Sequence, residues 1–148
     1  MDTEYSGICA TDLGFQAGKI KPCPYPAIFG HEATGKILDK GGKVQNKNWK
    51  VRDRVRLSMN YRQKCKVCKS DHPADCVEGT RLHLFGLGNN GTTAAKLNGS
   101  GVRFHFFGQS SFAKRSFLHE TCVAKIPDGV EDEGYTITRG YGLRLSNR

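Results

Sequence analysis

The chain has no long apolar run and no apolar stretch behind a basic start. A membrane-spanning helix needs about 20 mostly apolar residues, and a secretory signal needs a basic segment followed by an apolar one. The opening MDTEYSG is acidic and polar instead, and the mean hydropathy of the 148 residues is -0.53. These absences predict a soluble globular protein with neither a membrane span nor a signal peptide.

Long blocks of like charge are also missing, although the formal net charge is +9. Lysine and arginine occur in short, scattered groups, such as KIK at 19–21 and KCKVCK at 64–69. Aromatic residues do not alternate with them as they do on surfaces where bases stack. The pattern favours a solvated basic surface, and a basic nucleic-acid-binding zinc protein remains an alternative that a salt-dependent gel shift would distinguish.

Helical periodicity is scarce, and no internal repeat is present. Short runs that alternate polar and apolar residues are common and predict strands. Residues 27–38 and 49–59 each predict a strand or a strand pair, and the pattern continues over 102–108, 111–118 and 120–127. Residues 81–102 are rich in glycine and asparagine and predict an exposed hairpin or loop. We therefore expect one mainly β domain, an irregular and partly open β-barrel, followed by a divergent tail over 134–148.

Three of the six cysteines fall within twelve residues, as Cys65, Cys68 and Cys76. This clustering indicates metal chemistry in a reducing, cytoplasmic compartment rather than a disulfide framework. Structural zinc sites usually have four Cys or His ligands. One step of three residues back from Cys65 is Arg62, which cannot ligate. The remaining candidates for a fourth ligand are Asp71, His72, Asp75 or a water, and three reduced cysteines without metal are the alternative.

A second group of residues combines Cys9 with His31, which lies 22 positions further on. Each has a carboxylate nearby, Asp12 for Cys9 and Glu32 for His31. Carboxylates behind ligating residues orient imidazoles and tune a bound metal. A cysteine and a histidine alone leave zinc two or more ligands short, which suits a catalytic site with further ligands from elsewhere.

The sequence GLGNNG at 86–91 matches a dinucleotide-binding fingerprint only superficially. That fingerprint must open a helix, with an acidic residue about 20 positions on. Here the short, glycine-broken TTAAKLNGSG follows, and no acidic residue occurs before Glu120. The segment therefore predicts a turn.

Five motifs occur in an informative order: GICATDL, PAIFGHEATG, KVRDRV, CKVCKSDHPADC and FFGQSSFA. In this order and spacing the chain resembles the zinc-dependent medium-chain alcohol dehydrogenases, and the last motif resembles their aryl- or benzyl-alcohol branch. The resemblance covers about residues 5–130. It implies a GroES-like catalytic domain over 1–133, acting in a complete homologue on a small-molecule alcohol or aldehyde with zinc and NAD(P).

The resemblance also implies roles for individual residues. Cys9 and His31 correspond to ligands of the catalytic zinc, and Thr11 to the hydroxyl that relays the proton of the alcohol. Asp12 and Glu32 correspond to carboxylates behind those ligands. The lobe cysteines correspond to three of the four thiolates of a structural zinc site: Cys65, Cys68 and Cys76. Arg62 stands where the family has the fourth.

The sequence also departs from this family. The third catalytic-zinc ligand, a downstream cysteine, has no counterpart, and neither the segment usually preceding the first motif nor the Rossmann half is present. We therefore expect a truncated fragment that is inactive alone, with a strand edge exposed to homo-oligomerisation or aggregation. Whether the chain is itself an enzyme stays open. The alternative is a non-catalytic zinc-binding β-module or pseudoenzyme.

Overall fold

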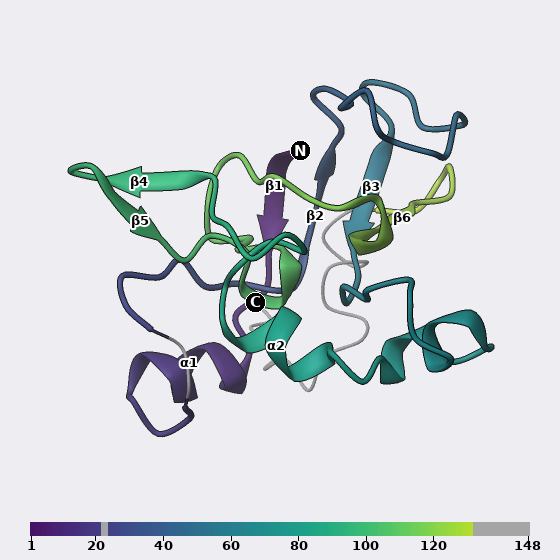
Figure 1. Cartoon of the computed structure of the whole chain (residues 1–148). Helices are drawn as coiled ribbons and strands as arrows, with labels where there is room; N and C mark the ends of the chain where they lie inside the picture. Colours follow the sequence, from purple (N-terminus) through teal and green to yellow (C-terminus); the bar gives the residue numbers. More distant parts are fainter. Residues whose placement is uncertain (22–23, 132–148) are drawn as a thin grey trace.

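An antiparallel sheet of four short strands forms the centre of the fold. The computed structural model describes residues 1–21 and 24–131. The strands are β1 (Asp2–Ser6), β2 (Ala33–Lys36), β3 (Arg54–Leu57) and β6 (Val123–Lys125), and they pair in the order β1-β2-β3-β6 (Figure 1). The mainly β prediction is confirmed, and three of these strands fall inside predicted segments.

The sequence of each central strand explains its place in the sheet. In β3 the side chains alternate, with Val55 and Leu57 buried and the two arginines partly exposed. Strand β2 is buried along most of its length. A Cβ atom at Gly35 would lie 2.0 Å from the backbone oxygen of Asp2 in β1. Only glycine therefore allows β1 to approach β2 this closely.

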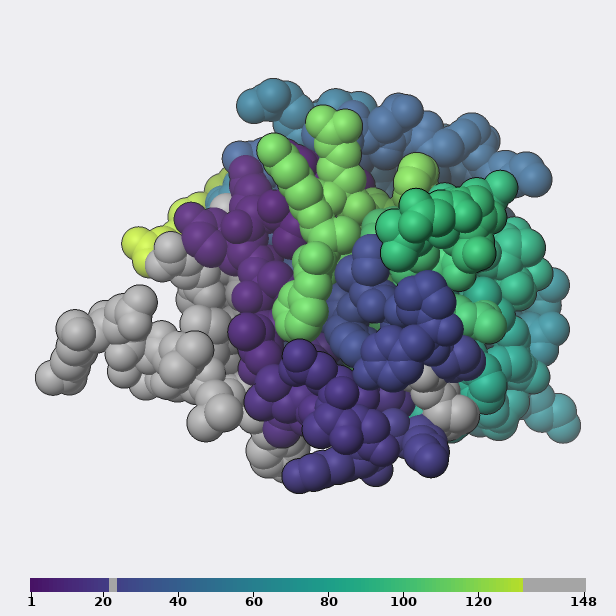
Figure 2. All heavy atoms as spheres, turned by 90° about the vertical axis from the view of Figure 1, so that its left-hand side faces the viewer, coloured from purple at the N-terminus to yellow at the C-terminus, as the bar shows by residue number. Residues whose placement is uncertain are grey.

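The outer edge of β1 is partly covered. Thr3 donates its backbone N–H to the carbonyl of Lys114 at 2.9 Å, and Ser116 donates to the carbonyl of Met1 at 3.1 Å. In Figure 2 the light-green segment accordingly lies along the purple N-terminal strand. The edge that the sequence predicted to be exposed is therefore bonded in part to residues 114–116.

The described helices are short. Two are α-helices, α1 (Ala10–Gln16) and α2 (Gly79–Leu84), and four are single 3-10 turns: η1 (Val67–Lys69), η2 (Pro73–Asp75), η3 (Phe106–Gly108) and η4 (Glu120–Cys122). Six or seven residues are too few to show a helical repeat in the sequence, so neither α-helix was predicted. No described helix is long and apolar enough to cross a membrane.

The predicted hairpin within 81–102 is present. Strands β4 (Ala95–Leu97) and β5 (Ser100–Val102) pair antiparallel, and they extend from one side of the molecule in Figure 1. Residues 86–91 lie between α2 and β4 without helical structure. The turn predicted for GLGNNG is thus confirmed, since no helix follows it.

Two strand predictions were wrong. Strand β5 ends at Val102, so most of 102–108 is not a strand, and no strand forms within 111–118. The backbone gives the reason, because Phe107, Gly108 and Ser110 have φ angles of 52°, 78° and 53°. These left-handed conformations turn the chain and prevent extended pairing.

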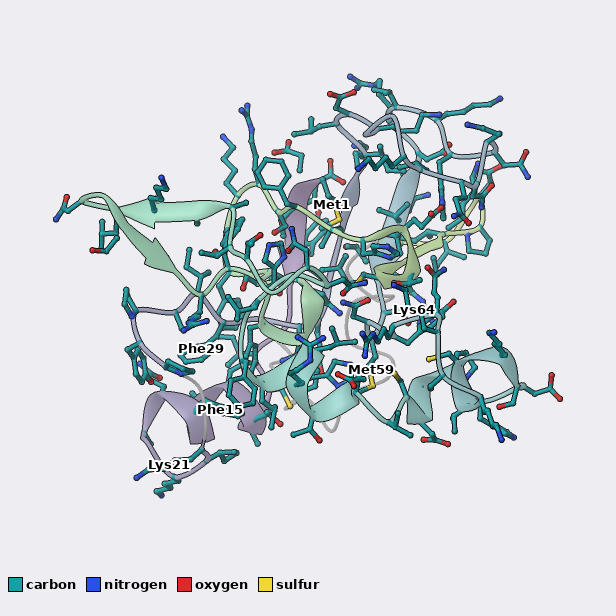
Figure 3. All side chains as sticks on the ribbon, in the orientation of Figure 1. Met1, Phe15, Lys21, Phe29, Met59 and Lys64 are labelled. Carbon is teal, nitrogen blue, oxygen red and sulfur yellow. The ribbon has the colours of Figure 1, made fainter. Side chains whose placement is uncertain are left out.

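An aromatic cluster joins α1 to the segment before β2. The ring of Phe15 lies 6.1 Å from that of Phe29 and 5.1 Å from that of Phe106, measured between centroids. Figure 3 labels the first two rings, which lie close together beside α1. Phe15 and Phe106 are almost completely buried. This packing fixes the helix against the chain that carries His31. The expected tail over 134–148 lies outside the described residues.

Replacing Val55 tests how far stability depends on the sheet. The side chain is fully buried, so we expect Val55→Ala to lower the free energy of unfolding by about 2–3 kcal/mol. Val51→Ala is the matched control because Val51 is 52% exposed, and it should change stability by less than about 0.5 kcal/mol. Urea denaturation followed by circular dichroism measures both, and equal midpoints would contradict the packing described here.

Candidate functional site

Two groups of side chains converge in the structure. In the first group, one ligand atom each of Cys9, His31 and Glu32 lies within 4.8 Å of the others. In the second, the same holds for the three sulfur atoms of the cysteine lobe, defined here as residues 62–78. The lobe lies beside the sheet and contains η1 and η2 (Figure 1). The structure thus brings together the residues that the sequence singled out, in two separate places.

The buried carboxylate of Asp12 organises the first group. Cys9 lies directly before α1, and its backbone N–H donates to Asp12 Oδ2 at 3.0 Å. The other oxygen, Oδ1, accepts the backbone N–H of Gly30 at 3.0 Å. Asp12 therefore ties the start of α1 to the loop that carries His31. Thr11, in the first turn of α1, has its Oγ1 3.6 Å from Cys9 Sγ.

His31 lies between two carboxylates. Its Nδ1 is 3.3 Å from Asp12 Oδ1, and its Nε2 is 3.9 Å from Glu32 Oε1. Burial lowers the pKa of His31, but the Asp12 carboxylate and Cys9 outweigh burial and raise it overall. Burial likewise favours neutral Asp12, yet His31 and the two backbone donors lower its pKa. Because Asp12 is engaged at Nδ1, Nε2 is the nitrogen available to a ligand.

Two motif glycines make room for this arrangement. A Cβ atom at Gly7 would lie 2.8 Å from Glu32 Oε2. At Gly30 the φ angle is +91°, and a Cβ atom would lie 2.4 Å from Ser111 Oγ and 2.6 Å from Phe112 N. A side chain at either position would displace the site or the loop behind it.

Sequence reasoning missed an aromatic stack behind His31. The ring of Phe107 lies between two imidazoles, 4.5 Å from His31 and 5.1 Å from His83 between centroids. Burial lowers the pKa of His83, whose Nε2 lies 2.8 Å from the carbonyl oxygen of Asn60. The motif FFGQSSFA pointed to this segment, but nothing in the sequence indicated the left-handed backbone that turns Phe107 toward His31.

In the cysteine lobe, backbone turns bring the thiols together. Cys68 lies within η1 and Cys76 follows η2. The sulfurs of Cys65 and Cys68 are 3.2 Å apart, and Cys68 N donates to Cys65 Sγ at 3.3 Å. Backbone N–H groups, of Val77 first and Cys68 next, lower the pKa of Cys65 to about 6.

The lobe offers three ligands in the part of the chain that the structure describes. Arg62 Nη1 forms an ion pair with Glu78 Oε1 at 3.0 Å, and Arg81 Nε pairs with Glu78 Oε2 at 2.8 Å. A guanidinium has no lone pair to offer a metal. The three candidates for a fourth ligand do not join the group of sulfurs: Asp71, His72 and Asp75.

The two groups differ in their fit to zinc. A thiolate, an imidazole and a carboxylate are all zinc ligands, and three protein ligands with an open position are typical of catalytic zinc sites. The Cys9 group fits that description. Structural zinc sites are closed by four Cys or His ligands, and the lobe does not supply four.

Comparisons with known proteins agree with this geometry. The family model described as alcohol dehydrogenase GroES-like domain matches residues 1–128. The geraniol dehydrogenase of Castellaniella defragrans is 36% identical over 148 residues, which cover 95% of this chain and 38% of that protein. The S-(hydroxymethyl)glutathione dehydrogenase of Komagataella pastoris is 29% identical, covering 97% and 38% respectively. The chain thus spans about two fifths of these relatives' length.

Solved structures extend the likeness to three dimensions. The benzyl alcohol dehydrogenase of Acinetobacter calcoaceticus superposes with a TM-score of 0.76 and 34% identity, covering 88% of this chain and 34% of that one. An alcohol dehydrogenase zinc-binding domain protein from Burkholderia ambifaria gives 0.76 and 33%, covering 84% and 33%. Since the family model spans most of the chain and these neighbours share both fold and sequence, the chain belongs to the alcohol dehydrogenase GroES-like domain family, within the zinc-type medium-chain alcohol dehydrogenases.

Proposed function

We propose that this chain carries the catalytic-zinc site of a dehydrogenase that oxidises primary alcohols, aromatic ones included, with NAD(P). The convergence of Cys9, His31 and Glu32 carries the proposal, because it supplies three zinc-type ligands around one point. Two similar proteins are named for geraniol and benzyl alcohol, which supports this class of substrate. The chain spans only part of those proteins, so the proposal concerns the complete enzyme.

Zinc would be held by Cys9 Sγ, His31 Nε2 and a Glu32 oxygen. The family resemblance places Glu32 behind the ligands, whereas one of its carboxylate oxygens lies within 4.8 Å of the donor atoms of Cys9 and His31. We therefore assign Glu32 the position that a downstream cysteine has in the family. Bound zinc would supply Lewis acidity toward the substrate oxygen, which makes the hydroxyl easier to deprotonate.

Thr11 and Asp12 would support the reaction in different ways. The Thr11 hydroxyl can accept one proton while donating another, and its place beside Cys9 suits it to take the proton of the alcohol. Asp12 would hold the His31 ring through Nδ1 and leave Nε2 for the metal. Hydride transfer is the chemistry of the nicotinamide, to which we assign no residue of this chain.

Exposed apolar side chains near the site indicate that this surface contacts other protein. Ile8 and Leu13 flank Cys9 and are 53% and 47% exposed. Exposed apolar side chains next to a site favour association, so we propose that this face contacts further protein, either another part of the enzyme or a second copy. Every described cysteine is unpaired, which supports a reducing location, and we propose the cytoplasm.

Replacing His31 tests the metal site. We expect His31→Ala to weaken Co²⁺ or Zn²⁺ binding at this site by at least about tenfold, because a ligand is lost. His72→Ala is the matched control, since this exposed histidine belongs to neither ligand group. Metal content after equilibrium dialysis and the cobalt absorption spectrum measure the change. Equal metal content in the two variants would contradict the assignment.

Replacing Asp12 tests the support behind the ligands. Both carboxylate oxygens accept backbone N–H groups, and an asparagine has only one oxygen. One buried donor therefore loses its acceptor, and Asp12→Asn should lower the free energy of unfolding by about 1–3 kcal/mol. Asp39→Asn, at an exposed position, should change it by less than about 0.5 kcal/mol. Denaturant titration compares them, and similar stabilities would argue against this role of Asp12.

The isolated chain should not oxidise alcohols. The described residues bring no dinucleotide-binding helix to the site, since GLGNNG leads into a hairpin. Benzyl alcohol with NAD or NADP at high protein concentration is the assay, with Thr80→Ala, at an exposed position in α2, as the control for Thr11→Ala. Turnover that Thr11→Ala abolishes and Thr80→Ala leaves intact would contradict this prediction. Bound metal without turnover would also suit the non-catalytic alternative.

A further inference from the structure

The cysteine lobe brings three thiols together, and an ion pair rather than a metal ion joins its two ends. Arg62 lies three residues before Cys65, and Glu78 lies two residues after Cys76. Their ion pair, at 3.0 Å, joins the two ends of the lobe. The residue that would otherwise supply a fourth thiolate instead ties the lobe through its side chain. The three sulfurs are thus held together, and no fourth ligand from residues 1–21 or 24–131 joins them.

The three thiols differ in their access to solvent. Cys76 is buried, with 6% of its surface exposed, whereas Cys65 and Cys68 are partly exposed. A ligand can therefore approach from the side of Cys65 and Cys68 and reach Cys76 last. The sulfurs of Cys65 and Cys68 already lie 3.2 Å apart. This is a trigonal face of soft donors that is open on one side.

We propose that the cysteine lobe is a three-thiolate site for thiophilic ions that are satisfied by three ligands, of which trivalent arsenic is the representative. Thiolate sulfur is a soft ligand and selects soft ions. A tetrahedral zinc ion would need its fourth ligand from solvent at this site. A trigonal ion needs none. The inference concerns a site separate from the Cys9 group and does not depend on the proposed dehydrogenase activity.

The binding reaction balances without any change of oxidation state. Arsenous acid, As(OH)₃, exchanges its three hydroxyl groups for the three sulfurs. Counted from the fully protonated lobe, three S–H and three As–O bonds break, three As–S and three O–H bonds form, and three water molecules leave. Each thiol proton goes to a departing hydroxyl group, and neither arsenic nor sulfur is oxidised or reduced. The step therefore requires no reagent beyond arsenite and the reduced lobe.

Arsenite titration of the full reduced chain tests the site. A phosphine keeps the cysteines reduced without adding competing thiols, and the near-ultraviolet absorbance of As–S bonds follows binding. We expect one arsenite per chain, and at least about tenfold weaker binding in each of Cys65→Ser, Cys68→Ser and Cys76→Ser, because each variant removes one of three bonds. Cys9→Ser, which removes the thiol of the other group, should bind arsenite as the unmodified chain does.

Two comparisons separate the proposal from its rivals. Unchanged binding in Cys76→Ser would show that Cys65 and Cys68 act as a simple dithiol, which would overturn the three-thiolate site. Arg62→Cys should strengthen zinc binding by at least about tenfold while leaving arsenite binding within about threefold, because only zinc uses a fourth thiolate. Displacement of arsenite from the unmodified chain by equimolar zinc would also overturn the proposal.

Far-UV circular dichroism confirms that each variant is folded, and Cys76→Ala replaces Cys76→Ser if the latter is not.

Discussion

The buried carboxylate of Asp12 is the constraint on which the Cys9 site depends. One oxygen accepts the backbone N–H of Cys9, the other accepts that of Gly30, and His31 Nδ1 faces the second at 3.3 Å. A helix start, a loop and an imidazole are thereby fixed by one side chain. Buried carboxylates are tolerated only with such partners. The contacts of Asp12 therefore determine both the arrangement of Cys9 and His31 and the packing of α1.

The two cysteine-containing groups show how one fold builds sites in different ways. The Cys9 group is assembled across elements, and it needs the close approach of glycine backbone to Glu32 and to Ser111. The lobe is assembled within one short segment and closed by the ion pair between Arg62 and Glu78. A substitution in the lobe can change its ligand count without disturbing the sheet. This independence allows the lobe to depart from the family pattern while residues 1–128 still match the family model.

The sequence predicted much of this architecture because strong local patterns survive in the fold. The alternation in β3 and the glycine-rich hairpin at 95–102 are both present. Residues 102–108 misled because Phe104 and Phe106 are buried in the core and Phe107 stacks on His31, and a positive φ at Phe107 gives no signal in the sequence. Residues 111–118 bond to the N-terminal segment that contains β1, through Lys114 and Ser116, without forming a strand. The motifs identified the residues of the Cys9 group. They could not show that a Glu32 carboxylate oxygen lies within 4.8 Å of the donor atoms of Cys9 and His31, since that needs the absence of a side chain at Gly7.

The parts of this molecule can form at different times during synthesis, because the residues in contact are close along the chain in some parts and far apart in others. The lobe closes over 62–78, and loops of this order close within about 10–100 ns once made. Strand β3 must instead wait for β6, since Val55 pairs with Lys125, 70 residues later. Contacts of such separation form slowly, and chains emerge N-terminus first. The thiols of the lobe are therefore brought together on a nascent chain whose sheet still lacks its last strand, and they can meet a soft ion before the protein has finished folding.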